Sequence, residues 1–183
     1  MTMDKGLDHT IIGESTKSYI DGLKGVLEYV GIDIDTLARH STFEETCYLL
    51  WYDRLPTAEE LASFTAEIRS CYDLSEGLWK MLAEVPIEAP PMHMLQSMMA
   101  ALAFDDPDCD LTTPEAEVKK AIRILAATPA IIANFDRRRR GLDFIAPDAS
   151  ENIATSFLHM LNGEVPGATS AHALDVCLVL HAD

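Results

Sequence analysis

The sequence predicts a mainly helical protein with one short β-hairpin near its amino terminus. Strand-like sequence is confined to residues 10–32, and apolar residues after them recur at the three- and four-residue spacing of helices. Most helix starts carry capping residues or first-turn prolines. With 183 residues the chain can form one domain with a sizeable core. We expect an amino-terminal arm and hairpin over residues 1–32 and a helical domain over residues 33–183, together forming a single structural unit.

Two β-rich segments predict the hairpin. Residues 18–20 read Ser-Tyr-Ile and are followed by Asp21-Gly22, a pair typical of tight turns. Residues 26–29 read Val-Leu-Glu-Tyr and supply the second strand. Everything after residue 32 follows helical spacing.

The first helices begin at capping residues. Thr42 with Glu45 and Thr57 with Glu60 fit the capping-box pattern, in which a hydroxyl and a carboxyl each accept a backbone N–H. Ser75 is predicted to cap the helix that follows them.

Prolines mark the next two helix starts. Pro91 suits a first helical turn, where no N–H is needed, and Thr113-Pro114 repeats that signal before a long apolar helix. Thr128-Pro129 lies within this helix. We expect the pair to kink or interrupt it, because proline removes a helical hydrogen bond.

Similar signals bound the last two helices. Asp148 with Glu151 predicts a third capping box, and Gly163 is predicted to end that helix. Ser170 is expected to begin the final helix.

The charge balance is strongly acidic. The 30 acidic and 14 basic residues give a formal net charge of -16, which argues against a nucleic-acid partner because phosphate backbones require clustered Lys and Arg. Both a salt-adapted source and an ordinary acidic protein fit this charge.

The four cysteines are widely spaced, with no CxxC pair and no Cys/His pair at zinc-ligand spacing, so we expect no metal site. The amino terminus lacks the features of a signal peptide, and no apolar run reaches the ~20 residues of a membrane span. We therefore expect a cytoplasmic protein without a membrane partner.

Several segments occur in a specific order. Residues 18–25 read SYIDGLKG, residues 42–51 read TFEETCYLLW, residues 157–164 read FLHMLNGE, and residues 178–183 read LVLHAD. In this order and spacing they resemble the citrate synthase family over almost the whole chain. The resemblance implies the mainly helical fold of that family's large domain.

Four positions in three segments depart from the family pattern. The family usually has Tyr-Arg-Gly-Tyr at residues 29–32, which here read Tyr-Val-Gly-Ile, and His-Pro-Met at residues 90–92, which here read Pro-Pro-Met. A common arginine is Gln96 in this chain. These changes indicate a divergent member, and none of the positions carries the family's chemistry.

The resemblance implies condensation of acetyl-CoA with oxaloacetate to citrate and CoA. In the family, a carboxylate removes the acetyl proton, histidines assist the enolate and the keto group, and arginines hold the dicarboxylate. These groups follow the point that matches Asp183, so we expect an amino-terminal portion with no catalytic residue and no activity alone.

The resemblance implies edges of a substrate site. His181 lies beside the oxaloacetate pocket in the family, and the alternative is a core histidine on an apolar helix. Arg137, Arg138, Arg139 and Arg140 could approach the phosphates of CoA, or they could offset the dipole at a helix carboxyl end. We expect no bound cofactor, with acetyl-CoA entering as a co-substrate.

The resemblance also implies a homodimer. In the family, the helices matching residues 92–102 and 121–132 pack against their own copies across a two-fold axis, and the alternative is a purely internal core. The expected interface residues are Met92, Leu95, Met98, Met99, Leu102, Ile124 and Ile131.

Three functions remain open at this level. The chain is the front part of a citrate synthase, one subunit of a split enzyme whose carboxyl-terminal half is a separate chain, or a non-catalytic dimerising relative. The acyl pocket lies outside this sequence, so propionyl-CoA, the substrate of 2-methylcitrate synthases, is an alternative to acetyl-CoA.

Overall fold

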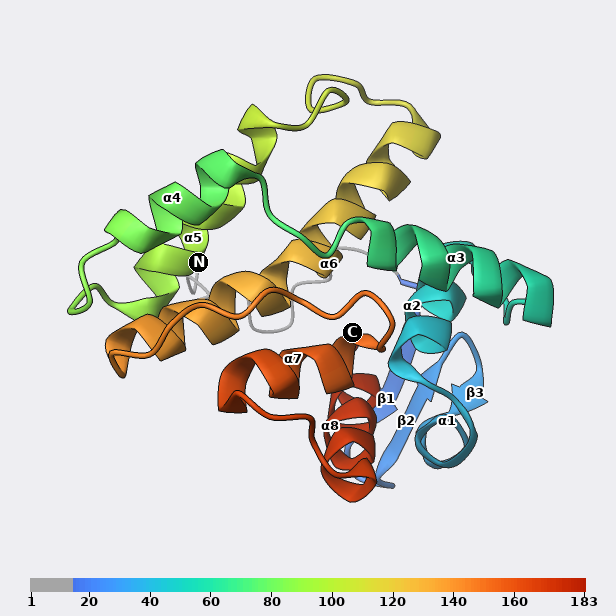
Figure 1. Cartoon of the computed structure of the whole chain (residues 1–183). Coiled ribbons are helices and arrows are strands. Elements are labelled where there is room, and N and C mark those ends of the chain that lie inside the picture. Colours follow the sequence, from blue (N-terminus) through green and yellow to red (C-terminus); the bar gives the residue numbers. More distant parts are fainter. Residues whose placement is uncertain (1–14) are drawn as a thin grey trace, which may run out of the picture.

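The computed structural model describes residues 15–183, in which eight α-helices and a small antiparallel sheet confirm the mainly helical class (Figure 1). The strands are β1 (Ser18–Asp21), β2 (Val26–Tyr29) and β3 (Ile32–Asp33). The helices are α1 (Ile34–His40), α2 (Phe43–Tyr52), α3 (Ala58–Ser70), α4 (Glu76–Glu84), α5 (Pro91–Ala101), the short 3-10 helix η1 (Leu102–Phe104), α6 (Pro114–Arg139), α7 (Ile153–Asn162) and α8 (Ala168–Leu180). The part of the predicted strand-like stretch before residue 15 lies outside the described residues.

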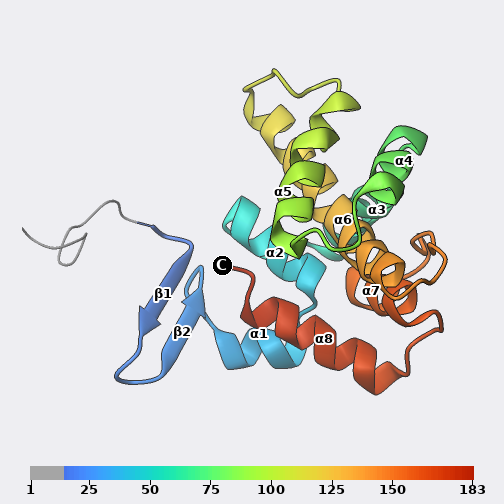
Figure 2. The same cartoon turned by 90° about the vertical axis from the view of Figure 1, so that its left-hand side faces the viewer.

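The predicted hairpin forms, with Asp21 in the first strand instead of the turn, and a third strand is added to it. Asp21 pairs with Val26, so the connection is residues 22–25, and the Asp21 carboxylate accepts the N–H groups of Leu23 and Lys24. β3 pairs antiparallel with β2 after a turn at Gly31, whose φ of 75° suits glycine. A strand this short has too little alternation to be recognised from sequence. The hairpin extends away from the helical body (Figure 2).

Most predicted helix starts are confirmed. Thr57 and Glu60 form both bonds of a capping box at α3, and the Ser75 hydroxyl accepts the Leu78 N–H at α4. At α2 only half of the box forms. Thr42 accepts the Glu45 N–H, but the Glu45 carboxylate instead accepts the hydroxyl of Ser41, at 2.7 Å. Pro91 and Pro114 occupy the first turns of α5 and α6 as predicted.

Of the two outcomes predicted at Pro129, a kink or an interruption, the interruption is wrong. α6 runs without a break from Pro114 to Arg139, a length of 26 residues. Pro129 has no N–H to donate to the preceding turn. The adjacent Thr128 hydroxyl donates to the carbonyl oxygen of Ile124, at 2.6 Å, which satisfies one acceptor of that turn.

Two helix starts near the carboxyl terminus differ from prediction. α7 is capped by Asn152, whose side chain accepts the Thr155 N–H, whereas the Asp148 carboxylate closes a turn with Ser150. α8 begins at Ala168, two residues before Ser170. Gly163 ends α7 with a φ of 87°, as predicted.

α6 is the central helix of the fold and contributes to two apolar cores (Figure 1). Ile122 is buried in the first core with Tyr29, which anchors the hairpin to the helices. Ile131 is buried in the second core with Met98 of α5. Within residues 15–183, no helix combines the length and apolar character needed to span a bilayer.

Candidate functional site

His181 stands at the carboxyl end of α8 and is exposed. Its Nδ1 lies 2.7 Å from the carbonyl oxygen of Cys177. A carbonyl only accepts hydrogen bonds, so Nδ1 carries the proton, and Nε2 of the neutral ring is left as an acceptor. This bond orients the imidazole and satisfies one of the last carbonyls of the helix.

The four consecutive arginines do not converge on one point. Arg137 is buried, and its Nε donates to the Asp143 carbonyl at 2.6 Å. Arg138 Nε donates to the Val85 carbonyl at 3.0 Å, and the Arg139 guanidinium lies over the Phe135 ring.

Arg140 likewise has partners within the chain. Its Nε lies 2.8 Å from the Asp136 carboxylate, and Nη2 donates to the Leu161 carbonyl. The carboxyl end of α6, which carries the four arginines, also lies away from the end of α8 with His181 (Figures 1 and 2). The structure therefore does not bring the two predicted parts of the substrate site together.

The predicted dimer-interface residues divide into three groups by their exposure. Met98 and Ile131 are fully buried in the second core of the chain. Met92 is 69% exposed and Ile124 is 49% exposed. The other predicted residues, Leu95, Met99 and Leu102, are partly buried.

A groove of about 240 Å³ lies between α5 and α6. Its lining residues are Pro91, Met92, Met94, Leu95, Ile132, Phe135, Asp136 and Arg139. We call it the α5–α6 groove. The α5–α6 groove includes Met92 and Leu95 of the predicted dimer interface. No other part of the described chain fills the groove beside these two residues.

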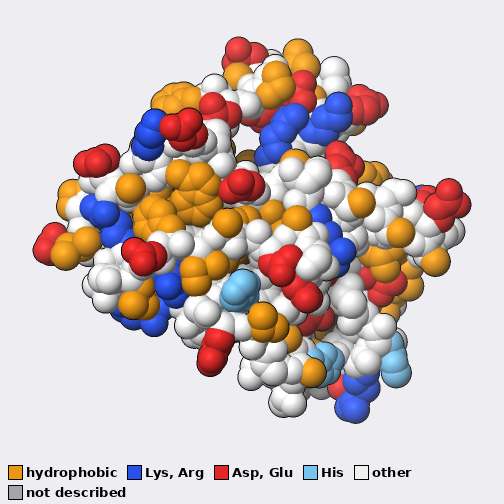
Figure 3. Space-filling model, viewed as in Figure 1, with side chains coloured by type: hydrophobic (Ala, Val, Ile, Leu, Met, Phe, Trp, Pro, Cys, Tyr) orange, Lys and Arg blue, Asp and Glu red, His pale blue; other side chains and the backbone are white. Residues whose placement is uncertain are grey.

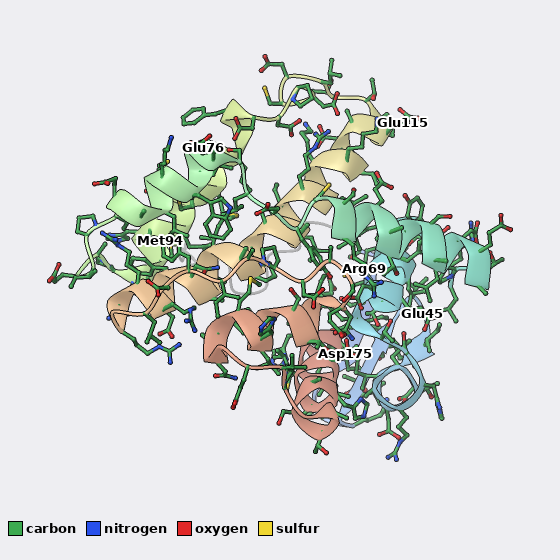
Figure 4. The ribbon with its side chains drawn as sticks, in the orientation of Figure 1. Glu45, Arg69, Glu76, Met94, Glu115 and Asp175 are labelled. Atoms are coloured by element: carbon green, nitrogen blue, oxygen red, sulfur yellow. The ribbon has the colours of Figure 1, made fainter. Side chains whose placement is uncertain are left out.

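Two buried carboxylates were not anticipated from the sequence. Glu44 Oε1 accepts the N–H of Ile153 at 2.9 Å, and Asp175 Oδ1 accepts the N–H of Phe43 at 3.2 Å. Asp175 lies where α8 approaches α2 (Figure 4). Burial raises the pKa of both carboxyl groups above their ordinary values, although these hydrogen bonds act in the opposite direction. In the sequence, Glu44 is indistinguishable from any acidic residue in a first helical turn.

The neighbouring thiol of Cys47 is poorly suited to nucleophilic chemistry. Burial, followed by the charges of Glu44 and Asp175, raises its pKa to about 12. Only the thiolate is strongly nucleophilic, and at neutral pH almost none is present. The described residues also contain no group of three or more His, Cys, Asp or Glu arranged to hold a metal ion.

A second, larger groove of about 580 Å³ lies between α2, α6, α7 and α8. Its lining residues are Phe43, Trp51, Ala121, Ile124, Leu125, Thr128, Pro129, Ile132, Ile153, Phe157, Leu174 and Leu178. We call it the apolar groove. On the face seen in Figure 3, acidic side chains are spread over much of the molecule, with hydrophobic side chains between them.

The chain matches known proteins over almost its whole length. The family described as "Citrate synthase, C-terminal domain" matches residues 6–183. The citrate synthase of Haloferax volcanii is 41% identical over 185 residues, covering 99% of this chain and 49% of that protein. A 2-methylcitrate synthase of Mycobacterium tuberculosis is 34% identical over 179 residues, covering 98% of this chain and 45% of that protein.

The fold also matches that of a solved structure. The crystal structure of citrate synthase from Pyrobaculum aerophilum superposes with a TM-score of 0.90 at 32% sequence identity. The match covers 97% of this chain and 46% of that one. The chain thus spans about half the length of the relatives it matches.

Proposed function

The chain belongs to the citrate synthase family, and we propose that it supplies one half of an enzyme that condenses acetyl-CoA with oxaloacetate. The observation that carries this is the extent of the fold match. Nearly all of the chain superposes on a solved citrate synthase, with a TM-score of 0.90, yet it accounts for 46% of that chain. The other half would supply the catalytic groups.

The chemistry of the described residues supports a need for that second half. The two carboxyl groups with raised pKa values, Glu44 and Asp175, accept backbone amides at helix starts and line neither groove. The Cys47 thiol is held in its protonated form. Proton abstraction from an acetyl group requires a base within hydrogen-bonding reach of the substrate, so we expect this chain to be inactive alone.

His181 is our candidate for the edge of the oxaloacetate site. The hydrogen bond to the Cys177 carbonyl uses Nδ1 and not Nε2, and the side chain is exposed. In the protonated ring, Nε2 could donate to a carboxylate of the substrate.

For the phosphates of CoA, Arg139 is the best candidate of the four arginines. Its described contact is with the ring of Phe135, which leaves its N–H donors available, and it lines the α5–α6 groove. Arg137 is buried, and its Nε already donates to the Asp143 carbonyl.

We also propose a homodimer formed through α5 and α6. Met92 and Leu95 would supply apolar contact from the α5–α6 groove. The four cysteines are all free, which suits the reducing cytoplasm where we place the activity.

Propionyl-CoA remains the alternative acyl substrate, because relatives named 2-methylcitrate synthase are 34% identical to this chain. The alternative to an enzyme half is a non-catalytic dimerising relative.

Co-expression tests these proposals. The 183-residue chain would be produced with the half of the Haloferax volcanii enzyme that it does not match, and CoA release would be followed with a thiol reagent. We expect turnover from the mixture with oxaloacetate and one of the two acyl-CoAs, and none from the chain alone. A turnover of about 10 per second from the chain alone, typical of complete enzymes, would contradict the proposal.

A further inference from the structure

The apolar groove has the shape of a trough with α6 as its floor. The α6 residues that line it recur at helical spacing between residues 121 and 132, so one continuous stripe of the helix faces the groove. This stripe is about 16 Å long, from 11 steps of 1.5 Å. Phe43 and Trp51 of α2 lie along the trough, as do the paired residues Leu174 and Leu178 of α8.

The groove offers almost nothing to a polar ligand. Of the described residues that line it, none is charged, and the hydroxyl of Thr128 already donates to the Ile124 carbonyl. Binding pockets for small molecules usually place a few polar groups to orient the ligand. Such groups are scarce here, which favours an apolar protein surface as the occupant.

Glu44 and Asp175 explain why the groove is apolar even where helices begin. Phe43 and Ile153 are the first residues of α2 and α7, and both line the groove. Backbone N–H groups at helix starts lack partners within the helix. Here the Asp175 and Glu44 carboxylates accept them from within the chain, so an occupant need not provide acceptors for these amides.

The helices around the groove leave apolar side chains exposed to solvent. Ile124 is 49% exposed and Ile132 is 38% exposed, although both belong to the floor. α8 has no distinct polar face, yet only Asp175 and Val179 of this helix are buried. A contiguous apolar surface of this kind marks an interaction site.

We propose that the apolar groove receives an apolar-faced α-helix of about three turns from the other half of a citrate synthase. This rests on the proposed function. Relatives that share this fold are about twice as long, so they contain further residues that are available to cover this groove. A concave trough also complements a single convex helix better than a second copy of itself. The exposed Met92 lies apart, in the α5–α6 groove.

Trp51 provides a direct readout of the groove. The chain has two tryptophans, and Trp79 is remote from the groove, with its ring packed on Phe144 and its N–H donated to Asp73. Replacing Trp79 with phenylalanine therefore isolates the fluorescence of Trp51. Docking of a helix should exclude water from Trp51 and shift its emission to shorter wavelength.

The test compares two glutamate variants in this Trp79→Phe background. Leu174→Glu places a carboxylate in the apolar groove. The control Met81→Glu places one on α4, where Met81 is 37% exposed and lines neither groove. Each chain is co-expressed with a tagged form of the unmatched Haloferax volcanii half, whose own first half serves as the positive control. Circular dichroism and urea unfolding establish that both variants fold.

We expect Leu174→Glu to weaken co-purification about tenfold or more and to abolish the Trp51 shift, because it would bury an unpaired carboxylate. Met81→Glu should leave both readouts unchanged. Co-purification of Leu174→Glu at the wild-type level, or no complex when the control halves associate, would overturn the docking proposal. Self-association of the isolated chain that Leu174→Glu alone abolishes would assign the groove to a second copy and also overturn it. A complex that shows the expected variant pattern but no turnover would refute only the proposed function.

Discussion

Glu44, near the start of α2, accepts a hydrogen bond from the backbone N–H of Ile153, the first residue of α7. The bond is buried and joins residues 109 positions apart in the sequence. Asp175 of α8 makes the matching contact with Phe43, the first residue of α2. Asp175 thus connects α8 to α2, and Glu44 connects α2 to α7. Each carboxylate accepts a backbone N–H from the first residue of the other helix, which has no acceptor within that helix.

Replacing Glu44 should show what this connection contributes to stability. Glu44→Ala leaves the buried N–H of Ile153 without a partner and should lower the free energy of unfolding by about 1–3 kcal/mol. Glu44→Gln retains an acceptor oxygen without the buried charge and should be close to neutral or stabilising. Urea unfolding followed by circular dichroism measures both. As a control, Glu45→Ala removes only a bond to Ser41 near the surface. If Glu44→Ala lowers the free energy of unfolding no more than Glu45→Ala does, the prediction that the buried Glu44–Ile153 bond stabilises the fold is wrong.

The buried carboxyl groups also predict a pH dependence. The pKa values of Glu44 and Asp175 are raised above the ordinary 4.5 and 3.8. In the window from these values up to the folded-state pKa values, the folded chain holds protons that the unfolded chain has released. The contribution of these groups to stability is therefore lost as the pH rises through that window.

A Glu44→Gln, Asp175→Asn variant does not titrate at these positions. Its stability relative to the wild type should increase from about pH 4 upward and then level off. Urea unfolding of both proteins over a pH series measures the difference, in which groups common to both cancel. A stability difference that does not change with pH would be inconsistent with raised pKa values.

Gly163 is predicted to be intolerant of a side chain. Its φ of 87° is disfavoured for other residues, and an added Cβ would lie 3.3 Å from Nη1 of the buried Arg137. Gly163→Ala should destabilise the chain by about 1–2 kcal/mol. Gly77 in α4 is the matched control because its added Cβ meets only the Ser75 hydroxyl at 3.7 Å. Gly77→Ala should stabilise by about 0.5–1 kcal/mol, so thermal unfolding should show opposite shifts.

Two methionines of α5 should respond differently to glutamate. Met98 is fully buried, so Met98→Glu should destabilise the fold by about 3 kcal/mol or more, whatever the oligomeric state. Met92 is exposed, so Met92→Glu should leave the unfolding transition unchanged but weaken the proposed dimer. Unfolding and sedimentation velocity separate these effects. A folded Met92→Glu variant that sediments as the same dimer as the wild type would show that α5 is not the interface.

Thiol labelling should distinguish the cysteines. Cys109 and Cys177 are exposed and should react readily with a thiol reagent at about pH 8, whereas Cys47 is buried with a pKa of about 12. Cys47 should become reactive only when urea unfolds the chain. Mass spectrometry of labelled peptides identifies each site, and rapid labelling of Cys47 in the native chain would contradict its placement in the core.

Local sequence determined several features of this protein. Capping at Thr57 and Glu60 depends on atoms within one helical turn, and the end of α7 depends on the conformational freedom of Gly163. Family membership was also accessible, because the order of short segments is a property of the sequence, and the match over residues 6–183 confirms it.

Tertiary structure decided the rest. Asp148 and Asn152 are both competent caps by residue type, but α7 begins after Asn152, where Glu44 of α2 accepts the N–H of Ile153. The sequence placed Met92 and Met98 on one apolar helix without distinguishing their surroundings. Burial of Met98 against Ile131, and exposure of Met92, follow from where α6 crosses α5. A helix that is apolar on every side carries no signal for the face it buries, so only the neighbouring elements determine it.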